Sequence, residues 1–335
     1  MKKIYLALTL IALTVPTLTG CSLNTSAESQ ESDTSANEKY KIGITQIVDH
    51  PALNESRDGF IERLNELGID AEISLQDAQG DIANAQMIAE KLVSDKSDLI
   101  LSIATPTSQA VQNATKNSDI PVIFTAVSDP VFSGLVINKE NPEANITGVT
   151  DEVSQDNLKE IIEALKSLNP DIKSIGIVYS TSESNSQVQV QNVRQVASDM
   201  DIEIEAVGIA SINDIHQALE SVSRKSQALI LINDNMIASS MELVSKVAME
   251  KGLITISAVS SFVEDGSLMS VGISYKELGR QSADMAYKVL KEKIQIAEIP
   301  VESSNTFIKK VNLSTLKALG LDENHKAFEG AEIIK

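Results

Sequence analysis

Residues 99–130 read LILSIATPTSQAVQNATKNSDIPVIFTAVSDP, and this stretch decides the class of fold. Two short runs of apolar and β-branched residues, 99–103 and 122–126, have the composition and length of strands. A polar turn follows each run, and the turn at 104–108 precedes a stretch that is typical of a helix. A strand, a helix and a second strand in this order predict a parallel β-α-β unit.

The same alternation recurs on both sides of this stretch. Strands are predicted at 42–47 and 71–75, and a second series begins near 146–149 with strands at 175–179, 202–207, 228–232 and 254–258. Apolar residues at helical spacing lie between them: Phe60, Ile61, Leu64 and Leu67; Ala85, Ile88, Ala89 and Leu92; Leu158, Ile161, Ile162, Leu165 and Leu168. We therefore predict an α/β protein of two lobes, each with a doubly wound parallel sheet, joined by a multi-strand hinge.

Two late elements are interpreted as return crossings between the lobes. They are a helix carrying Leu278, Ala283, Ala286, Val289 and Leu290, and a strand at 305–311. The N-terminal lobe is thus predicted to comprise residues 39–150 and about 273–297, and the C-terminal lobe 151–272 and about 298–335.

The first residues predict export. Lys2 and Lys3 precede an apolar run at 4–15, which is too short to span a bilayer, and Leu18-Thr19-Gly20-Cys21 follows. The Leu-x-Gly-Cys ending resembles a bacterial lipobox, which implies a signal peptide at 1–20 and lipidation of Cys21; the alternative is an ordinary signal peptide. Residues 21–38 are polar and without apolar periodicity, as in a disordered tether.

Composition and missing motifs narrow the classes of function. The formal charge is −19, and loss of the two lysines with the signal makes it more negative, so nucleic acid is not an expected partner. Cys21 is the single cysteine, which excludes an intrachain disulfide and thiolate metal sites. The three histidines stand far apart, and no phosphate-loop, dinucleotide or nucleophile-elbow motif is present. We expect neither catalysis nor a cofactor or metal.

Ligands of doubly wound sheets bind beyond the carboxyl ends of strands, where this chain is polar. The turn at 105–108 could receive a carboxylate on the backbone N–H groups of a helix start, or its threonines could simply cap that helix. Asp234 could pair with a ligand ammonium or cap the next helix, and Ser128 and Asp129 could extend the polar wall or form a turn. Together these positions suit a zwitterion.

Four segments stand out together, and the ordered set resembles a known family. They are Ala104-Thr105-Pro106-Thr107, residues 124–130 (FTAVSDP), Asn145-Ile146-Thr147-Gly148-Val149 and residues 179–186 (YSTSESNS); Leu278-Gly279 fits as well. The chain resembles, over roughly residues 40–321, the ABC-transporter substrate-binding family whose better-known members take up aromatic amino acids, tryptophan especially.

This resemblance implies a type I periplasmic-binding-protein fold with an amino acid held in the cleft. The implied ligand contacts are Gln46, Thr105, Thr107, Ser108, Ser128, Asp129, Ser182, Asn185 and Asp234. Tyr179, Phe132, Phe262, Pro51 and Leu53 are available to line an apolar slot for a ring, with core packing as the alternative for the two phenylalanines. Ser260-Ser261 departs from a Gly-Glu-like pair that such relatives often carry, so that wall of the pocket differs.

The implied partners are a small ligand, an ABC permease with its ATPase, and the membrane through the lipid anchor. The protein is then a monomer, exported and anchored at the outer face of the bacterial cytoplasmic membrane, and it closes by hinge motion around its ligand. A surface sensor or adhesion lipoprotein of the same fold, or an importer for nucleosides or other amino acids, remains an alternative.

Overall fold

The computed structural model describes residues 39–142, 144–304 and 306–335. The predicted signal peptide, Cys21, the tether at 21–38 and the first residue of the predicted strand at 305–311 lie outside these ranges. Within them, none of the helices combines the length and the apolar character that crossing a membrane requires.

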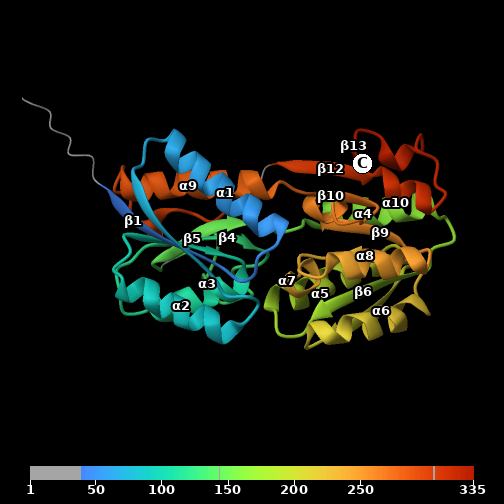
Figure 1. The fold of residues 1–335 in the computed structure, drawn as a ribbon, viewed down its shortest axis with the longest axis horizontal. Coiled ribbons are helices and arrows are strands. Elements are labelled where there is room, and N and C mark those ends of the chain that lie inside the picture. The colour runs from blue at the N-terminus through green and yellow to red at the C-terminus, as the bar shows by residue number, and fades with distance from the viewer. Residues whose placement is uncertain (1–38, 143, 305) are drawn as a thin grey trace, which may run out of the picture. The chain divides into compact units, whose positions relative to one another are not determined.

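The first lobe is built on a six-stranded parallel sheet. Its order is β11-β5-β4-β3-β1-β2. The strands are β1 (Tyr40–Gln46), β2 (Ala71–Asp77), β3 (Leu99–Ile103), β4 (Val122–Val127), β5 (Ile146–Thr150) and β11 (Glu302–Ser303). The helices are α1 (Pro51–Glu66), α2 (Ile82–Ser94), α3 (Thr105–Thr115) and α9 (Tyr275–Leu290). Figure 1 shows α1 and α9 on one face of this sheet and α2 and α3 on the other.

The second lobe repeats this strand order. Its seven-stranded sheet runs β13-β12-β10-β9-β8-β6-β7, so β7-β6-β8-β9-β10 corresponds to β2-β1-β3-β4-β5. The strands are β6 (Ser174–Ser180), β7 (Glu203–Ile209), β8 (Ala228–Leu231), β9 (Ile254–Val259), β10 (Met269–Ile273), β12 (Phe307–Asn312) and β13 (Glu332–Ile334). The α-helices are α4 (Gln155–Leu168), α5 (Ser184–Ser198), α6 (Ile215–Ser223), α7 (Asn235–Ala238), α8 (Met241–Glu250) and α10 (Leu313–Ala318), with 3-10 turns at Ile212–Asp214, Ser260–Val263 and Lys326–Phe328. Only the β10–β12 pair among the described strands is antiparallel.

The predicted fold class, two doubly wound parallel-sheet lobes with a multi-strand hinge, is confirmed. Both strand orders are the doubly wound order with a switch point beside the first strand of the lobe, where crevices for ligands form. The apolar spacing of α4 is also confirmed, because Leu158, Ile161, Ile162 and Leu165 are buried while Ser154 caps the helix at the Asn157 N–H. We did not predict β5 and β10 as strands, because both are short and contain a glycine.

Over the described residues, the chain crosses between the lobes three times. The crossings follow β5, β10 and β11, because β11 still pairs with β5 while β12 pairs with β10. They lie side by side, since the Ser274 N–H donates to the Thr306 carbonyl at 3.1 Å and the Ser304 N–H to the Thr150 carbonyl at 3.2 Å. Residues of a hinge made in this way are close enough to contact both lobes.

Helix α9, which follows the second crossing, returns to the first lobe and packs on α1 (Figure 1). Glycines permit the close approach of the two helices: a Cβ on Gly279 would lie 1.8 Å from the Ser56 carbonyl oxygen, and one on Gly59 2.3 Å from that of Lys276. No side chain fits at either position without moving the helices apart. The pair therefore fixes where α9 begins, and with it the position of Tyr275.

Candidate functional site

A small cavity lies where the carboxyl ends of the strands of both lobes meet. Thirteen residues line it, among them Leu53, Ala126 and Ser128 of the first lobe and Asn185 and Asn233 of the second. Its free volume is about 20 Å³, close to what one water molecule requires. An amino acid does not fit in this volume, so the lobes must separate to admit one and then close around it less tightly than in the described conformation.

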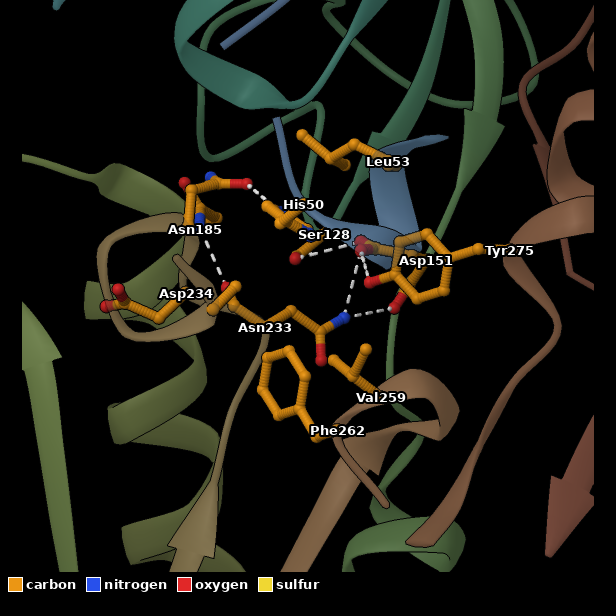
Figure 2. A pocket seen from close by; sticks show the side chains of 13 residues that line it. His50, Leu53, Ser128, Asp151, Asn185, Asn233, Asp234, Val259, Phe262 and Tyr275 are labelled. Atoms are coloured by element: carbon orange, nitrogen blue, oxygen red, sulfur yellow. Dashed lines mark hydrogen bonds between the residues drawn. The ribbon is translucent and has the colours of Figure 1, made fainter. Parts of the chain in front are cut away.

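Asp151, in the first hinge crossing, is the centre of the polar lining. One carboxylate oxygen accepts from the Ser128 hydroxyl at 2.9 Å, and the other from the Tyr275 hydroxyl at 2.7 Å and the Asn233 Nδ2 at 2.9 Å. Figure 2 shows these side chains converging on Asp151 from different elements. The carboxylate thus joins the end of β4, the start of α9 and the end of β8.

The Asp151 charge has no cationic partner in the described lining of the cavity. Among the described residues that line it, none is Lys or Arg. Burial raises the pKa of Asp151 above its ordinary value, although hydrogen bonds from Tyr275, Ser128 and Asn233 oppose that effect. Burial and the neighbouring Asp151 likewise raise the pKa of Tyr275, so its hydroxyl remains a donor. A buried carboxylate of this kind favours a ligand that brings a positive charge.

A second carboxylate, Glu183, organises the opposite wall. It accepts from the Asn235 side-chain amide at 2.5 Å, from the Asn185 amide at 3.2 Å and from the Met236 N–H at 3.2 Å. Burial and the nearby Asp234 raise the pKa of Glu183 to about 7. The Asn235 oxygen then faces Nε2 of His50 across the lobe interface at 3.5 Å, and burial lowers the pKa of His50 to about 4, which keeps the imidazole neutral.

Apolar side chains supply the remaining surface. Leu53 of α1, Val259 at the end of β9 and Phe262 in the following 3-10 turn line the cavity, and all three are buried (Figure 2). Leu53 and Phe262 belong to one cluster of buried apolar side chains that includes residues of both lobes. The cavity therefore combines a carboxylate with apolar walls, as a site for a small amphipathic ligand requires.

Direct hydrogen bonds hold the lobes together beside the cavity. Gln189 of α5 donates to the Ser128 hydroxyl at 3.0 Å, and the Ser184 hydroxyl donates to that of Ser133 at 3.3 Å. The Asn233 amide bridges from the second lobe to the Asp151 carbonyl at 3.1 Å. The described conformation is accordingly a closed one.

The backbone is unusual at the carboxyl ends of two strands of the first lobe, β3 and β4. Ala104 and Ala126 have φ of 81° and 56°, in the left-handed region that costs energy for a residue with a Cβ. The β4–β5 register shifts next to Ala126, as at a β-bulge, and the bulge directs the following residues. It places Ser128 within reach of Asp151.

Three of the predicted contact residues, Ser128, Asn185 and Asp234, line the cavity. The Asp234 carboxylate accepts from the Ile237 N–H at 2.9 Å, the Ser180 N–H at 2.6 Å and the Ser186 hydroxyl at 2.7 Å. The capping alternative for Asp234 is therefore the one that the geometry shows, and its contact with a ligand stays a prediction.

The predicted residues of the first lobe are mostly engaged within it. Gln46 donates to Asn54 and Asp77, Thr107 donates to the carbonyls of Ile103 and Ala104, and the Ser108 hydroxyl donates to the Ala104 carbonyl at 2.8 Å. Neither threonine caps α3, because Ala104 occupies the cap position without a side-chain bond. The Thr105 hydroxyl is buried with no partner among the described residues.

The other predictions fall away from the cavity. Asp129 accepts from the Val131 and Phe132 N–H groups, which is the turn alternative. Tyr179 is half-buried in β6 and is not a lining residue, and Ser182 lies at a wider hollow of about 330 Å³ between Pro106 and Glu183. Phe132 and Pro51 are exposed, and Ser260 donates to the Ile273 carbonyl.

Sequence reasoning missed Asp151, Tyr275, Glu183 and Gln189. Asp151 directly follows β5, so recognising that strand would have placed an acidic residue at a carboxyl end. The described residues include no group of three or more His, Cys, Asp or Glu side chains arranged to hold a metal ion.

Comparison with known proteins gives consistent similarities. A family model described as ABC transporter substrate binding protein matches residues 41–332. A protein of Clostridioides difficile (strain R20291) named tyrosine-binding protein is 39% identical over 328 residues, which cover 96% of this chain and 93% of the relative.

Two solved structures bear on the conformation. A domain from Streptococcus pneumonia in complex with L-Trp has a TM-score of 0.83 at 29% identity, covering 89% of this chain and all of that one. A ligand-free, open substrate-binding protein with adhesive properties from Clostridium difficile has a TM-score of 0.67 at 41% identity, covering 88% and 99%. The lower score at higher identity indicates that the lobes are arranged differently from those of the open relative.

Proposed function

Since the chain belongs to the ABC transporter substrate-binding protein family, we propose that it captures an aromatic amino acid between its lobes for an ABC permease and its ATPase. The observation that carries the proposal is the buried Asp151 carboxylate, which faces a cavity whose described lining includes no lysine or arginine. An α-ammonium group supplies the missing charge and can donate three hydrogen bonds. We assign this role to Asp151 and not to Asp234, because Asp234 caps a helix with two backbone N–H groups of its own lobe, whereas Asp151 lies in the hinge and contacts side chains of both lobes.

The apolar walls and the relatives support an aromatic side chain. Leu53, Val259 and Phe262 offer a buried surface on which a ring can pack. The similar proteins include one named tyrosine-binding and one solved with L-Trp. The ligand carboxylate is assigned to the start of α3, where backbone N–H groups lack helical partners and the Thr105 hydroxyl is unpaired among the described residues.

Titration calorimetry with tyrosine, tryptophan, phenylalanine and leucine tests the proposal. Saturable binding of an aromatic amino acid with micromolar affinity, and a rise in melting temperature with ligand concentration, are expected. Binding of leucine alone would discard the aromatic ligand and keep the transport role. Absence of binding to all four would reject the proposal.

Membrane attachment belongs to the same proposal. Cleavage before Cys21 and lipidation of its thiol would hold the protein at the outer face of the membrane, beside the permease. Metabolic labelling with a fatty-acid analogue should mark the native chain, and Cys21→Ala should abolish both the label and the membrane fraction. A labelled Cys21→Ala variant would contradict the lipobox assignment.

Adhesion is a second candidate function, because a 41% identical relative has adhesive properties. Asp151→Asn separates the two roles. This substitution should impair ligand capture and uptake of labelled amino acid, whereas binding to host cells should persist if the chain is also an adhesin.

A further inference from the structure

Three buried polar atoms at the cavity have no hydrogen-bond partner among the described residues. They are Nδ1 of His50, Oδ1 of Asn185 and Oδ1 of Asn233. All three side chains are at least nine-tenths buried. Because unpaired buried polar atoms are rare in folded proteins, each atom needs a partner that enters the cavity.

Surrounding contacts fix both asparagine oxygens as acceptors. The Asn185 amide nitrogen donates to Glu183 and to the Asn233 carbonyl, at 3.2 and 2.9 Å, so its oxygen is the free atom. The Asn233 amide nitrogen donates to Asp151, and Figure 2 shows its oxygen on the side of Phe262. Reversing either amide would point N–H groups away from a carboxylate or carbonyl.

The hydrogen bonds that join Glu183, Asn235 and His50 determine that Nδ1 of His50 is an acceptor. Asn235 donates to Glu183, so its oxygen must face His50 and accept from Nε2–H. Nδ1 of the neutral ring therefore carries a lone pair. Glu183 sets the tautomer of a histidine that belongs to the other lobe.

The lining consequently presents acceptors that a ligand must match with donors. In the view of Figure 2, Asp151 and Tyr275 lie on one side of the cavity and Asn185 on the other. The ligand ammonium, bound at Asp151 beside Asn233, leaves the acceptors of His50 and Asn185 for another part of the ligand. Resting on the proposed function, we infer that these two atoms accept a hydrogen bond from a donor on the ligand's ring, so that the site selects tyrosine or tryptophan over phenylalanine.

The expected selectivity follows from the cost of an unpaired acceptor. Phenylalanine would displace water from His50 and Asn185 without replacing its hydrogen bonds, whereas a phenol O–H or an indole N–H can donate to them. Sites that bind a ligand hydroxyl in this way reject the analogue without it strongly. We expect tyrosine to bind at least ~10-fold more tightly than phenylalanine.

Calorimetry on the purified protein tests this with matched ligand pairs. The pairs are tyrosine with phenylalanine, tyrosine with O-methyltyrosine, and tryptophan with 1-methyltryptophan; in each, the second member has lost the ring donor. His50→Phe should bring the tyrosine-to-phenylalanine affinity ratio close to one. His216→Phe, an exposed histidine outside this cavity, is the control and should keep the ratio of the native protein.

The outcomes separate this inference from the proposed function. Equal binding of tyrosine and phenylalanine by the native protein would overturn the donor requirement and leave aromatic capture intact. If His50→Phe lowers the affinity for both ligands by the same factor, His50 does not accept the hydrogen bond from the ring donor. Absence of binding to every aromatic amino acid would overturn both proposals, and the native protein decides this even if the variant fails to fold.

Discussion

Asp151→Asn isolates the charge at the centre of the site, because the side chain keeps its size and loses its negative charge. A hydrogen bond to a charged group contributes roughly 1.5–3 kcal/mol, and a tenfold change in affinity corresponds to about 1.4 kcal/mol. If a ligand ammonium pairs with Asp151, the variant should bind its aromatic amino acid about 10- to 150-fold more weakly by calorimetry.

The ligand-free variant provides the control for this prediction. The raised pKa of Asp151 indicates that its burial without a cation is unfavourable, so removing the charge should leave the melting temperature of the ligand-free protein unchanged or higher. The asparagine amide can keep these contacts, because its oxygen can accept from Tyr275 and Asn233 while its nitrogen donates to the Ser128 hydroxyl. A variant that melts much earlier and binds ligand as tightly as the native protein would refute the ammonium assignment and make Asp151 a structural hinge residue.

Four further outcomes are expected. The pKa of Glu183 is about 7 in the folded protein and 4.5 in the unfolded chain, so the folded state binds the proton more tightly. The free energy of unfolding should therefore fall as the pH rises from 4.5 to 7. Glu183→Gln should flatten this dependence in denaturant titrations. Gly279→Ala forces a Cβ against a carbonyl of α1 and should cost ~1–3 kcal/mol by calorimetric unfolding; native-like stability would mean that the helices separate easily. Gln189→Leu removes a bond between the lobes and should weaken ligand binding about tenfold, whereas Gln187→Leu, which bonds only within its lobe, should not. Asp151→Asn should make the ligand-free protein more compact in X-ray scattering, and an unchanged scattering profile would contradict a charge penalty on closure.

The fold was predictable because buried strands and helices leave recognisable patterns of apolar residues in the sequence. Parallel strands covered on both faces are continuous apolar runs, and β3, whose five residues are all buried, was found to the residue. β5 contains a glycine that a tight contact requires, since a Cβ on Gly148 would lie 2.0 Å from the Phe124 carbonyl oxygen. Gly148 interrupts the apolar run of β5, and the reason for a glycine there becomes clear only when β4 and β5 are paired.

The sequence indicated where the site lies but not which carboxylate has which role in it. Polar turns after strands correctly indicated Ser128 and Asn185 as cavity residues. Sequence could not distinguish Asp234 from Asp151, because each follows a strand and the difference lies in what surrounds the carboxylate. Backbone N–H groups of its own lobe engage Asp234, whereas Asp151 meets Tyr275 from a position 124 residues away.

The position of Asp151 links the charge of the ligand to the closure of the lobes. Its carboxylate accepts from Ser128 and Tyr275 of the first lobe and from Asn233 of the second, so closure completes its hydrogen bonds and also removes it from water. Burial makes that closed state unfavourable while the charge is unpaired, and a bound ammonium offsets the penalty. A ligand shifts an equilibrium only by its differential affinity for the two states, and this pairing exists fully only in the closed one. Under the proposed function, the hinge carboxylate therefore makes closure depend on a ligand that carries an ammonium group.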